Sequence, residues 1–259
     1  MGALWQGLAV QRRVILALML RETHTIYGDA RLGYLWVLIQ SAFGIAVFWG
    51  MRVFVGAGDP HGMPVAVFLI LGFGVWTVMS DSISKCLNAV RVNQPLLTFP
   101  QVTELDVMLS RVAVIFVTQL VVSVLLLSVA YALGIEVRLN DAGLLYACLL
   151  LAPLFGLGCG MTLSALVVFI PSIERIVPLV MRLLFFVSGV FFSANSFGND
   201  IAEILRLNPM LHLIELTRGA FSFSYPVDGM SLGYVSICTL CLLSVGLLLE
   251  RYVRPRRER

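Results

Sequence analysis

The sequence has few charged side chains for its length and almost no lysine. Asp, Glu, Lys and Arg make up 13% of the 259 residues, whereas an ordinary soluble domain has about 25%. The only lysine is Lys85, which stands in the run S-K-C, so the chain lacks a G-x-x-x-x-G-K-[ST] phosphate-binding loop. The motifs H-E-x-x-H and G-x-S-x-G are also absent, and the three histidines are widely separated. These absences exclude ATP hydrolysis through such a loop and leave no cluster of catalytic groups.

Apolar residues, by contrast, are in large excess. They form 59% of the chain, and the mean hydropathy is +0.93. A chain of this length cannot hide so much apolar surface from water within one soluble core, so its solvent must include a lipid bilayer. We therefore expect an all-α polytopic membrane protein.

The five cysteines do not indicate a disulfide or metal framework. Cys238 and Cys241 form a C-x-x-C pair, but no second pair or histidine cluster accompanies it. Both lie inside an apolar run, where a thiol packs as a small hydrophobic side chain. We expect no metal site.

Six apolar stretches have about the 20 residues that a helix needs to cross the hydrocarbon core. They are residues 34–54, 64–84, 108–133, 143–170, 176–194 and 231–250. Before them, residues 1–30 mix apolar positions with Arg12, Arg13, Arg21 and Glu22, a pattern typical of an amphipathic helix that lies along the membrane interface. Within the fourth stretch, Ala152, Gly156, Gly160 and Ser164 recur every four residues and predict close helix packing.

The distribution of basic residues predicts the orientation. With the N-terminus inside, fourteen basic residues fall on the cytoplasmic side and four (Arg52, Arg138, Arg206 and Arg218) on the other. Cytoplasmic loops carry the excess of Lys and Arg, so both termini are expected inside. The basic tail 251–259 is expected to rest beside anionic lipid rather than to bind nucleic acid.

Two connecting segments have features of their own. In the cytoplasmic segment 88–106, Pro95 suits the first turn of a short helix, and Leu96, Leu97 and Phe99 form an apolar face. This face is compatible with an interfacial loop on lipid or with a docking surface for a soluble partner. The outer segment 193–230 is interrupted by Asn208-Pro209 and predicts two short helices that dip back into the membrane against protein or a water-filled path.

Ionisable and aromatic residues near the spans are candidates for a polar path. Arg182 lies inside the fifth apolar stretch, where a charge either faces a cavity or reaches back to the surface. Aromatic rings can stack on sugars, although interfacial belts account for many of them. The candidates are Arg31, Tyr34, Trp36, Phe48, Trp49, Arg52, Arg182, Phe185, Phe186 and Phe192.

Four segments resemble a known family in order along nearly the whole chain. They are A-L-M-L-R-E-T-H-T-I-Y-G-D-A-R-L-G-Y-L-W-V-L-I-Q, S-I-S-K, N-Q-P-L-L-T-F-P-Q-V and N-P-M-L-H-L-I-E-L-T-R-G-A-F. The family is that of the permease subunits of bacterial polysaccharide ABC exporters, of ABC-2 type, and the group 2 capsular exporters are the most similar. Before the Arg31-Leu32-Gly33 motif the chain departs from the family by having Asp29-Ala30.

The resemblance implies a homodimer in the bacterial inner membrane with two copies of a separate ATPase, which would use ATP and Mg²⁺; this chain itself would bind no cofactor. It also implies a periplasmic co-polymerase and a lipid-linked polysaccharide substrate. In the family, the loop after the second span couples to the ATPase, which would involve Arg91, Asn93, Gln94, Pro95, Leu96, Leu97 and Phe99. The outer segment would supply a gate with Asn208, Pro209, His212, Glu215 and Arg218.

The expected function is therefore the channel-forming, non-catalytic subunit of an ATP-driven exporter of lipid-linked acidic capsular polysaccharide. An O-antigen or teichoic-acid exporter would have the same architecture. A different class, an ion-coupled secondary transporter, would show inverted repeats and a carboxylate at mid-membrane, and only Asp81 approaches that position. A membrane-embedded enzyme would need clustered acids or histidines.

Overall fold

The computed structural model describes residues 2–27, 33–56, 58–99 and 101–257, and all regular structure in these ranges is helical. The long helices are α1 (Gly2–Tyr27), α2 (Gly33–Phe54), α3 (Val65–Leu87), α6 (Glu104–Ala132), α7 (Ala142–Val167), α8 (Ile173–Val187) and α11 (Leu232–Arg257). The short ones are η1 (Pro60–Gly62), α4 (Ala89–Val92), α5 (Gln94–Leu97), η2 (Ala194–Ser196), α9 (Asn199–Leu205) and α10 (Pro209–Phe221). The all-helical prediction is confirmed.

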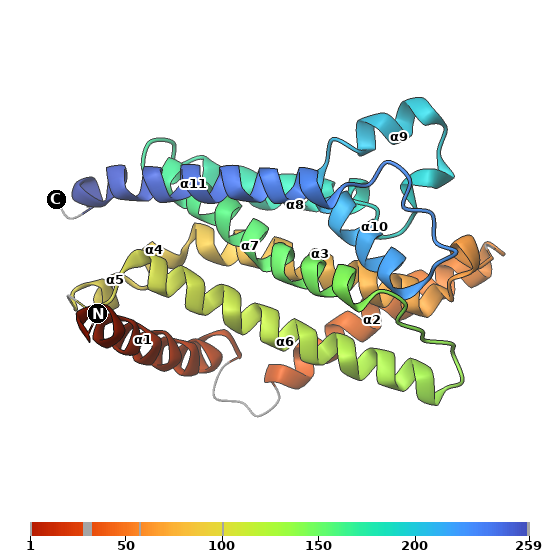
Figure 1. Ribbon diagram of the computed structural model, residues 1–259, viewed down its shortest axis with the longest axis horizontal. Helices are drawn as coiled ribbons and strands as arrows, with labels where there is room; N and C mark the ends of the chain where they lie inside the picture. The colour runs from red at the N-terminus through yellow and green to blue at the C-terminus, as the bar shows by residue number, and fades with distance from the viewer. Residues whose placement is uncertain (1, 28–32, 57, 100, 258–259) are drawn as a thin grey trace.

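The long helices form a bundle with two distinct ends (Figure 1). Both termini lie at one end together with α4 and α5, and we call this the termini end. At the opposite end lie α9, α10 and the turn between α6 and α7, and we call this the outer-segment end. The arrangement puts the segments 88–106 and 193–230 at opposite ends of the bundle.

Four helices are long and apolar enough to cross a membrane among the described residues: Val65–Leu87, Glu104–Ala132, Ala142–Val167 and Leu232–Arg254. The described part of α2, Trp36–Arg52, is a shorter apolar helix. The fifth predicted stretch, 176–194, corresponds to α8, which ends seven residues early at Val187. Its 15 residues span only about 22 Å, less than the hydrocarbon core of about 30 Å.

The central helix of the bundle is α3, which packs against α6, α7 and α10. In its most apolar window 78% of the residues are buried, compared with 17% for α11. The close α3–α7 contact depends on the small residues predicted to mediate packing. A Cβ at Gly156 would collide with Ser82, and one at Gly160 would collide with Cys86. The packing prediction for this stripe is confirmed.

Local sequence explains where two of the long helices begin. The Thr103 hydroxyl accepts a hydrogen bond from the Asp106 backbone N–H, and the Asp106 carboxylate accepts one from the Thr103 backbone, which is a capping box at the start of α6. The Asp141 carboxylate accepts from the Leu144 N–H and caps α7. These caps satisfy backbone donors that would otherwise lie unpaired at helix ends.

The N-terminal helix α1 packs against α6 through a buried ion pair. Arg111 Nε donates to Glu22 Oε1 at 2.9 Å, and Arg111 Nη1 donates to the Lys85 carbonyl at 3.1 Å near the end of α3. The side chain of Arg111 is 6% exposed and that of Glu22 is 2% exposed, so both charges lie inside the bundle. The Glu22 carboxylate of α1 can be buried because Arg111 pairs with it. Arg111 also donates to the Lys85 carbonyl near the end of α3, where the helix leaves its last carbonyls without a partner.

Candidate functional site

A cavity of about 580 Å³ lies between α2, α3, α6 and α8. Its lining combines polar side chains with aromatic rings, in a part of the bundle where the helices are otherwise apolar. Asp81 and Lys85, one helical turn apart on α3, provide its two charges. The remaining lining residues are Trp36, Val37, Gln40, Ser41, Phe73, Trp76, Thr77, Ser80, Ile115, Thr118, Gln119 and Phe185. We call this space the polar cavity.

Four aromatic residues form most of the apolar part of its lining. The rings of Trp76 and Phe185 have centroids 5.5 Å apart, and those of Phe73 and Phe185 are 5.6 Å apart with a T-shaped arrangement. Trp36 contributes a further ring from α2. Flat rings beside amide and hydroxyl groups can hold a sugar by stacking and by exchangeable hydrogen bonds, without tight binding.

Further aromatic rings lie beyond the cavity lining, toward the outer-segment end. Phe48, on α2, stacks on Phe191 with centroids 3.8 Å apart and an interplanar angle of 28°. Phe191 also contacts Phe73 at 5.7 Å and Phe185 at 4.8 Å. The set Phe48, Phe73, Phe185, Phe186 and Phe191 is called the aromatic cluster below.

The candidate path residues from the sequence have different positions. Trp36 and Phe185 line the polar cavity, and Phe48 and Phe186 belong to the aromatic cluster. Arg52 donates to the Gly58 carbonyl at 2.9 Å beyond the cluster, and Phe192 packs on Phe197. Trp49 and Arg182 are both exposed, and neither they nor Phe192 line the cavity. Arg31 lies outside the described residues, as does the side chain of Tyr34.

Sequence reasoning missed most of the polar lining. Gln40, Thr77, Thr118 and Gln119 were not selected, Asp81 was considered only as a carboxylate near mid-membrane, and Lys85 was not among the candidates for the path. A signal was present, because Thr77, Asp81 and Lys85 follow one another at four-residue intervals on one face of α3. Polar residues at that spacing in an otherwise apolar helix indicate a shared polar surface.

The candidate gate residues at the outer-segment end make specific hydrogen bonds. Asn208 Oδ1 caps α10 by accepting from the Met210 N–H, while its Nδ2 donates to Ser188 Oγ at 2.8 Å. Pro209 follows in the first turn of α10. His212 Nδ1 accepts from the Ser231 N–H, which leaves Nε2 to carry the proton and donate to the Arg206 carbonyl at 2.7 Å.

Glu215 and Arg218 form a fully buried ion pair, with Arg218 Nη1 donating to Glu215 Oε1 at 2.9 Å. Arg218 Nη1 and Nη2 also donate to the carbonyls of Gly189 and Val190 at 2.7 and 2.8 Å. On the other side, Arg218 Nε donates to the Phe68 carbonyl, and its guanidinium carbon lies 3.4 Å from the centre of the Phe68 ring. One cation thus joins α10, α3 and the chain after α8.

The Glu215 carboxylate has three further contacts. Ser193 Oγ donates to Oε2 at 3.0 Å, and the Tyr225 hydroxyl lies 2.9 and 3.0 Å from the two oxygens. Burial raises the pKa of Tyr225, so the hydroxyl remains protonated and acts as a donor. These donors and Arg218 together satisfy the oxygens of the buried carboxylate. The group Glu215, Arg218, Tyr225 and Ser193 is called the buried anchor.

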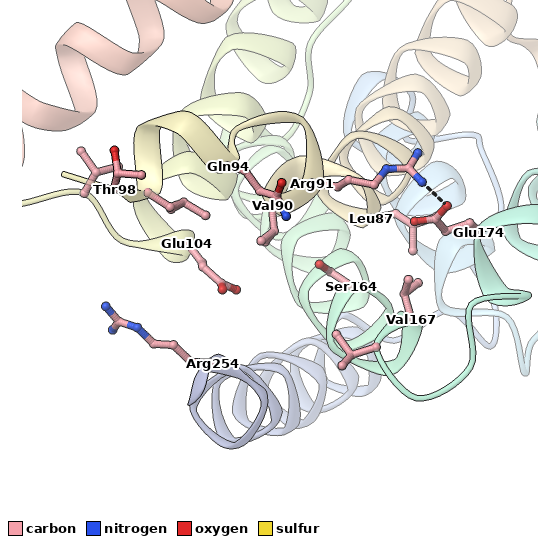
Figure 2. Close-up of a pocket in the computed structure, with 13 residues that line it drawn as sticks. Leu87, Val90, Arg91, Gln94, Thr98, Glu104, Ser164, Val167, Glu174 and Arg254 are labelled. Atoms are coloured by element: carbon pink, nitrogen blue, oxygen red, sulfur yellow. Dashed lines mark hydrogen bonds and ion pairs between the residues drawn. The ribbon is translucent and has the colours of Figure 1, made fainter. Parts of the chain in front are cut away.

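A second cleft, of about 440 Å³, opens at the termini end between α4, α5, α7, α8 and α11 (Figure 2). On one side Arg91 Nη1 pairs with Glu174 Oε2 at 2.8 Å and so connects α4 with the first turn of α8. Glu104 and Arg254 lie on the other side. Charged groups from four helices therefore surround this cleft.

The candidate coupling residues are divided between this cleft, the core and the surface. Arg91, Gln94 and Leu97 line the cleft, whereas Asn93 is buried and accepts a hydrogen bond from Arg21 Nη1 at 2.9 Å. Leu96 and Leu97 pack half-buried against the core around Leu18 and Met108, so Phe99 is the exposed member of the predicted apolar face. The exposed candidates are Arg91, Gln94, Pro95 and Phe99.

Comparison with known proteins finds one family whose model matches most of the chain: the ABC-2 type transporter family, over residues 13–222. The polysialic acid transport protein KpsM of Escherichia coli is 28% identical over 95% of both chains. The capsule polysaccharide export inner-membrane protein CtrC of Neisseria meningitidis serogroup B is 27% identical over 94% of this chain and 92% of its own. The corresponding protein BexB of Haemophilus influenzae is 24% identical over 95% and 93%.

Proposed function

Because the chain belongs to the ABC-2 type transporter family, we propose that it is the membrane subunit of an ATP-driven exporter of lipid-linked, acidic capsular polysaccharide. The observation that carries this proposal is the match, over nearly full length, to relatives named for polysialic acid transport and capsule polysaccharide export. Their names also support a place in the bacterial inner membrane. An O-antigen or teichoic-acid exporter is the second candidate, since the same architecture would serve it.

The proposed topology has six spans with both termini in the cytoplasm. It uses α2, α3, α6, α7, α8 and α11 as spans, although α8 is short. The placement of both termini at one end of the bundle supports it (Figure 1). In this topology the termini end faces the cytoplasm, α1 lies at the inner surface and the outer-segment end faces the periplasm.

We place the polymer path in the polar cavity and extend it between two copies of the chain. Lys85 would attract the carboxylates of an acidic glycan, while Asp81 keeps the cavity from becoming strongly positive. Weak, exchangeable contacts suit a polymer that must slide, because tight binding would slow its release. Arg31 and Arg182 remain candidates for the cytoplasmic mouth of the path.

The chain would require partners to do this work. The proposed complex contains two copies of this chain and two copies of an ATPase that uses ATP and Mg²⁺, and it meets a periplasmic co-polymerase. The ATPase would dock on the exposed residues of the segment 88–106. The Arg91–Glu174 pair then offers a route from α4 to α8, and α8 carries Phe185 into the polar cavity.

Substitution of Lys85 tests the path. In cells that depend on this chain, Lys85→Gln should lower the amount of surface polysaccharide several-fold, and Lys85→Arg should restore most of it because the charge returns. Membrane levels of the protein are measured in parallel. Tyr146→Ala, an exposed aromatic on α7, is the matched control and should export normally. Normal export by Lys85→Gln would remove Lys85 from the path.

Substitution of Phe99 tests the docking surface. Phe99 is 60% exposed, so Phe99→Asp should leave the fold intact and reduce the amount of ATPase that co-purifies with the chain. Phe223→Asp, at the opposite end and 83% exposed, is the control. Unchanged co-purification of the ATPase with Phe99→Asp would argue against docking on this segment.

A further inference from the structure

The contact between Phe48 and Phe191 lies where the polar cavity ends. Along α2 the cavity lining stops at Ser41, and Phe48 lies about two turns farther toward the outer-segment end. Along α3 the last lining residue in that direction is Phe73, whose ring contacts both Phe48 and Phe191. A chain leaving the cavity in this direction meets the stacked pair first.

The two partners of this contact are held very differently. Phe191 belongs to the segment 188–193, in which Ser188, Val190 and Ser193 are at most 1% exposed. Arg218 binds three carbonyls of this segment, those of Gly189, Val190 and Phe192, and Glu215 binds the Ser193 hydroxyl.

Two glycines make this arrangement possible. Gly189 has a φ of +77°, and a Cβ there would collide with Leu211 of α10. At Gly72, a Cβ would collide with the Arg218 guanidinium, so the absence of a side chain on α3 opens the space through which Arg218 reaches the segment. The segment that carries Phe191 is therefore fixed to α10 and α3 by buried hydrogen bonds and by close packing.

Phe48, by contrast, is carried by a helix that has little buried surface. Among the described side chains of α2 only Ile45 is buried, and Phe43, Val47, Trp49 and Met51 are exposed. Among the described residues of α2, Arg52 is the side chain that hydrogen-bonds to the rest of the chain, to the Gly58 carbonyl at 2.9 Å and to the Phe191 carbonyl at 3.5 Å, the limit of a hydrogen bond. Moving α2 thus breaks few polar contacts, whereas moving the segment 188–193 breaks the buried anchor.

We propose that Phe48 and Phe191 form a seal at the outer end of the polar cavity, that α10 with the buried anchor is the stationary side of this seal, and that opening occurs by movement of α2. This assigns His212, Glu215 and Arg218 a positioning role instead of contact with the polymer. The inference rests on the proposed function in that the cavity is taken as part of the export path. It differs from the expectation that the outer segment itself supplies the gate.

Cross-linking distinguishes the two sides of the seal. The double variant Phe48→Cys and Phe191→Cys, closed with a short bifunctional thiol reagent that carries a reducible link, should lose polysaccharide transport in the complex reconstituted with its ATPase. Reduction should restore transport. The wild-type chain, with its five native cysteines, receives the same treatment as a control. Full transport by the cross-linked protein would overturn the seal.

A single substitution provides the matched cross-link on the stationary side. Cys148 on α7 lies beside Thr217 on α10, so oxidation of the Thr217→Cys variant should tie α10 to α7. We expect this protein to retain transport after oxidation. Loss of transport that returns on reduction would overturn the assignment of α10 as stationary. Failure of the proposed function would look different, because the untreated wild-type complex would then move no polysaccharide.

A leak measurement tests the seal in the absence of polymer. Phe48→Ala in the complex reconstituted into liposomes, without nucleotide, should release a small entrapped anionic dye faster than wild type. Tyr146→Ala should release it at the wild-type rate, since its ring is exposed on α7 away from the cavity lining. A Phe48→Ala complex as tight as wild type would contradict the seal even if the cross-linked protein were inactive.

Discussion

Helix α10 carries charged residues and is mostly buried, whereas helix α2 is mostly apolar and is mostly exposed. In α10, which carries His212, Glu215 and Arg218, ten of thirteen residues are buried. In α2 nearly every residue is apolar, and among the described side chains only Ile45 is buried. In a membrane protein the hydrocarbon solvent accepts apolar side chains, whereas polar groups must find partners inside. The comparison shows that the charged helix is the internal support and that the apolar helix is the peripheral, less constrained one.

The largest effect is expected where a charge of α10 is removed. Arg218→Met leaves Glu215 buried beside unpaired carbonyls of Phe68, Gly189 and Val190, which should cost about 3–5 kcal/mol of folding free energy. The measurement is the yield of monodisperse protein after detergent extraction, together with its thermal midpoint. Arg138→Met is the control, since Arg138 pairs with Glu136 on the surface at 76% and 63% exposure. Equal stability of the two variants would contradict the stabilising role of the buried anchor.

A comparable but separable effect is expected at the termini end, where Arg111 pairs with Glu22. Arg111→Met should destabilise the chain by about 3 kcal/mol because the Glu22 carboxylate is left buried without its partner. The double variant Glu22→Leu and Arg111→Met should be more stable than the sum of the two single variants predicts. Thermal midpoints of the four proteins give the coupling. Strict additivity would mean that the two charges act independently.

A moderate effect is expected from glycines, and here α2 is the control helix. Gly160→Ala places a methyl group against Cys86 where α7 meets α3, and it should cost about 1–3 kcal/mol through overpacking. Gly50→Ala on α2 has no atom within 4 Å of the new methyl group, so stability should be unchanged or rise by about 0.5–1 kcal/mol through the better helix propensity of alanine. The same sign of change at both positions would contradict the α3–α7 packing.

The smallest effect on stability is expected at the exposed face of α2. Phe43 is 70% exposed, so Phe43→Leu should change the free energy of unfolding of the single chain by less than about 0.5 kcal/mol. The thermal midpoint should therefore stay close to that of the wild type. If two copies of the chain pack through this face, the fraction of dimer in detergent should fall while the fold remains intact. Light scattering measures the dimer fraction and circular dichroism the fold. Unfolding of the variant would place α2 in the core.

Much of the fold followed from the sequence because long apolar runs have one stable conformation in a bilayer. The runs at 64–84, 108–133 and 143–170 correspond to α3, α6 and α7, and the stripe of small residues through Gly156 and Gly160 predicted the close packing of α7. The break at Asn208-Pro209 likewise separates α9 from α10. These signals are local, and each depends on one helix.

The candidate site was harder to predict because its residues converge from four helices. Trp36 and Phe185 were selected for their rings, but Thr77, Asp81 and Lys85 acquire a shared role only when α3 is placed beside α2 and α6. Arg182 was selected as a path residue because it lies inside an apolar stretch, but it is not part of the described lining of the polar cavity. The side of α8 that faces the cavity is set by its packing against α3, which no single-helix pattern specifies.

The sequence by itself therefore determined the class of molecule: its composition requires a bilayer, and its apolar runs require helices. Only the tertiary structure decided the placement of the charges. Glu22 pairs with Arg111 across 89 positions of the chain, and Arg218 binds the carbonyl of Phe68 across 150. The physical reason is that a buried charge is stable only with specific partners, and those partners come from distant parts of the chain.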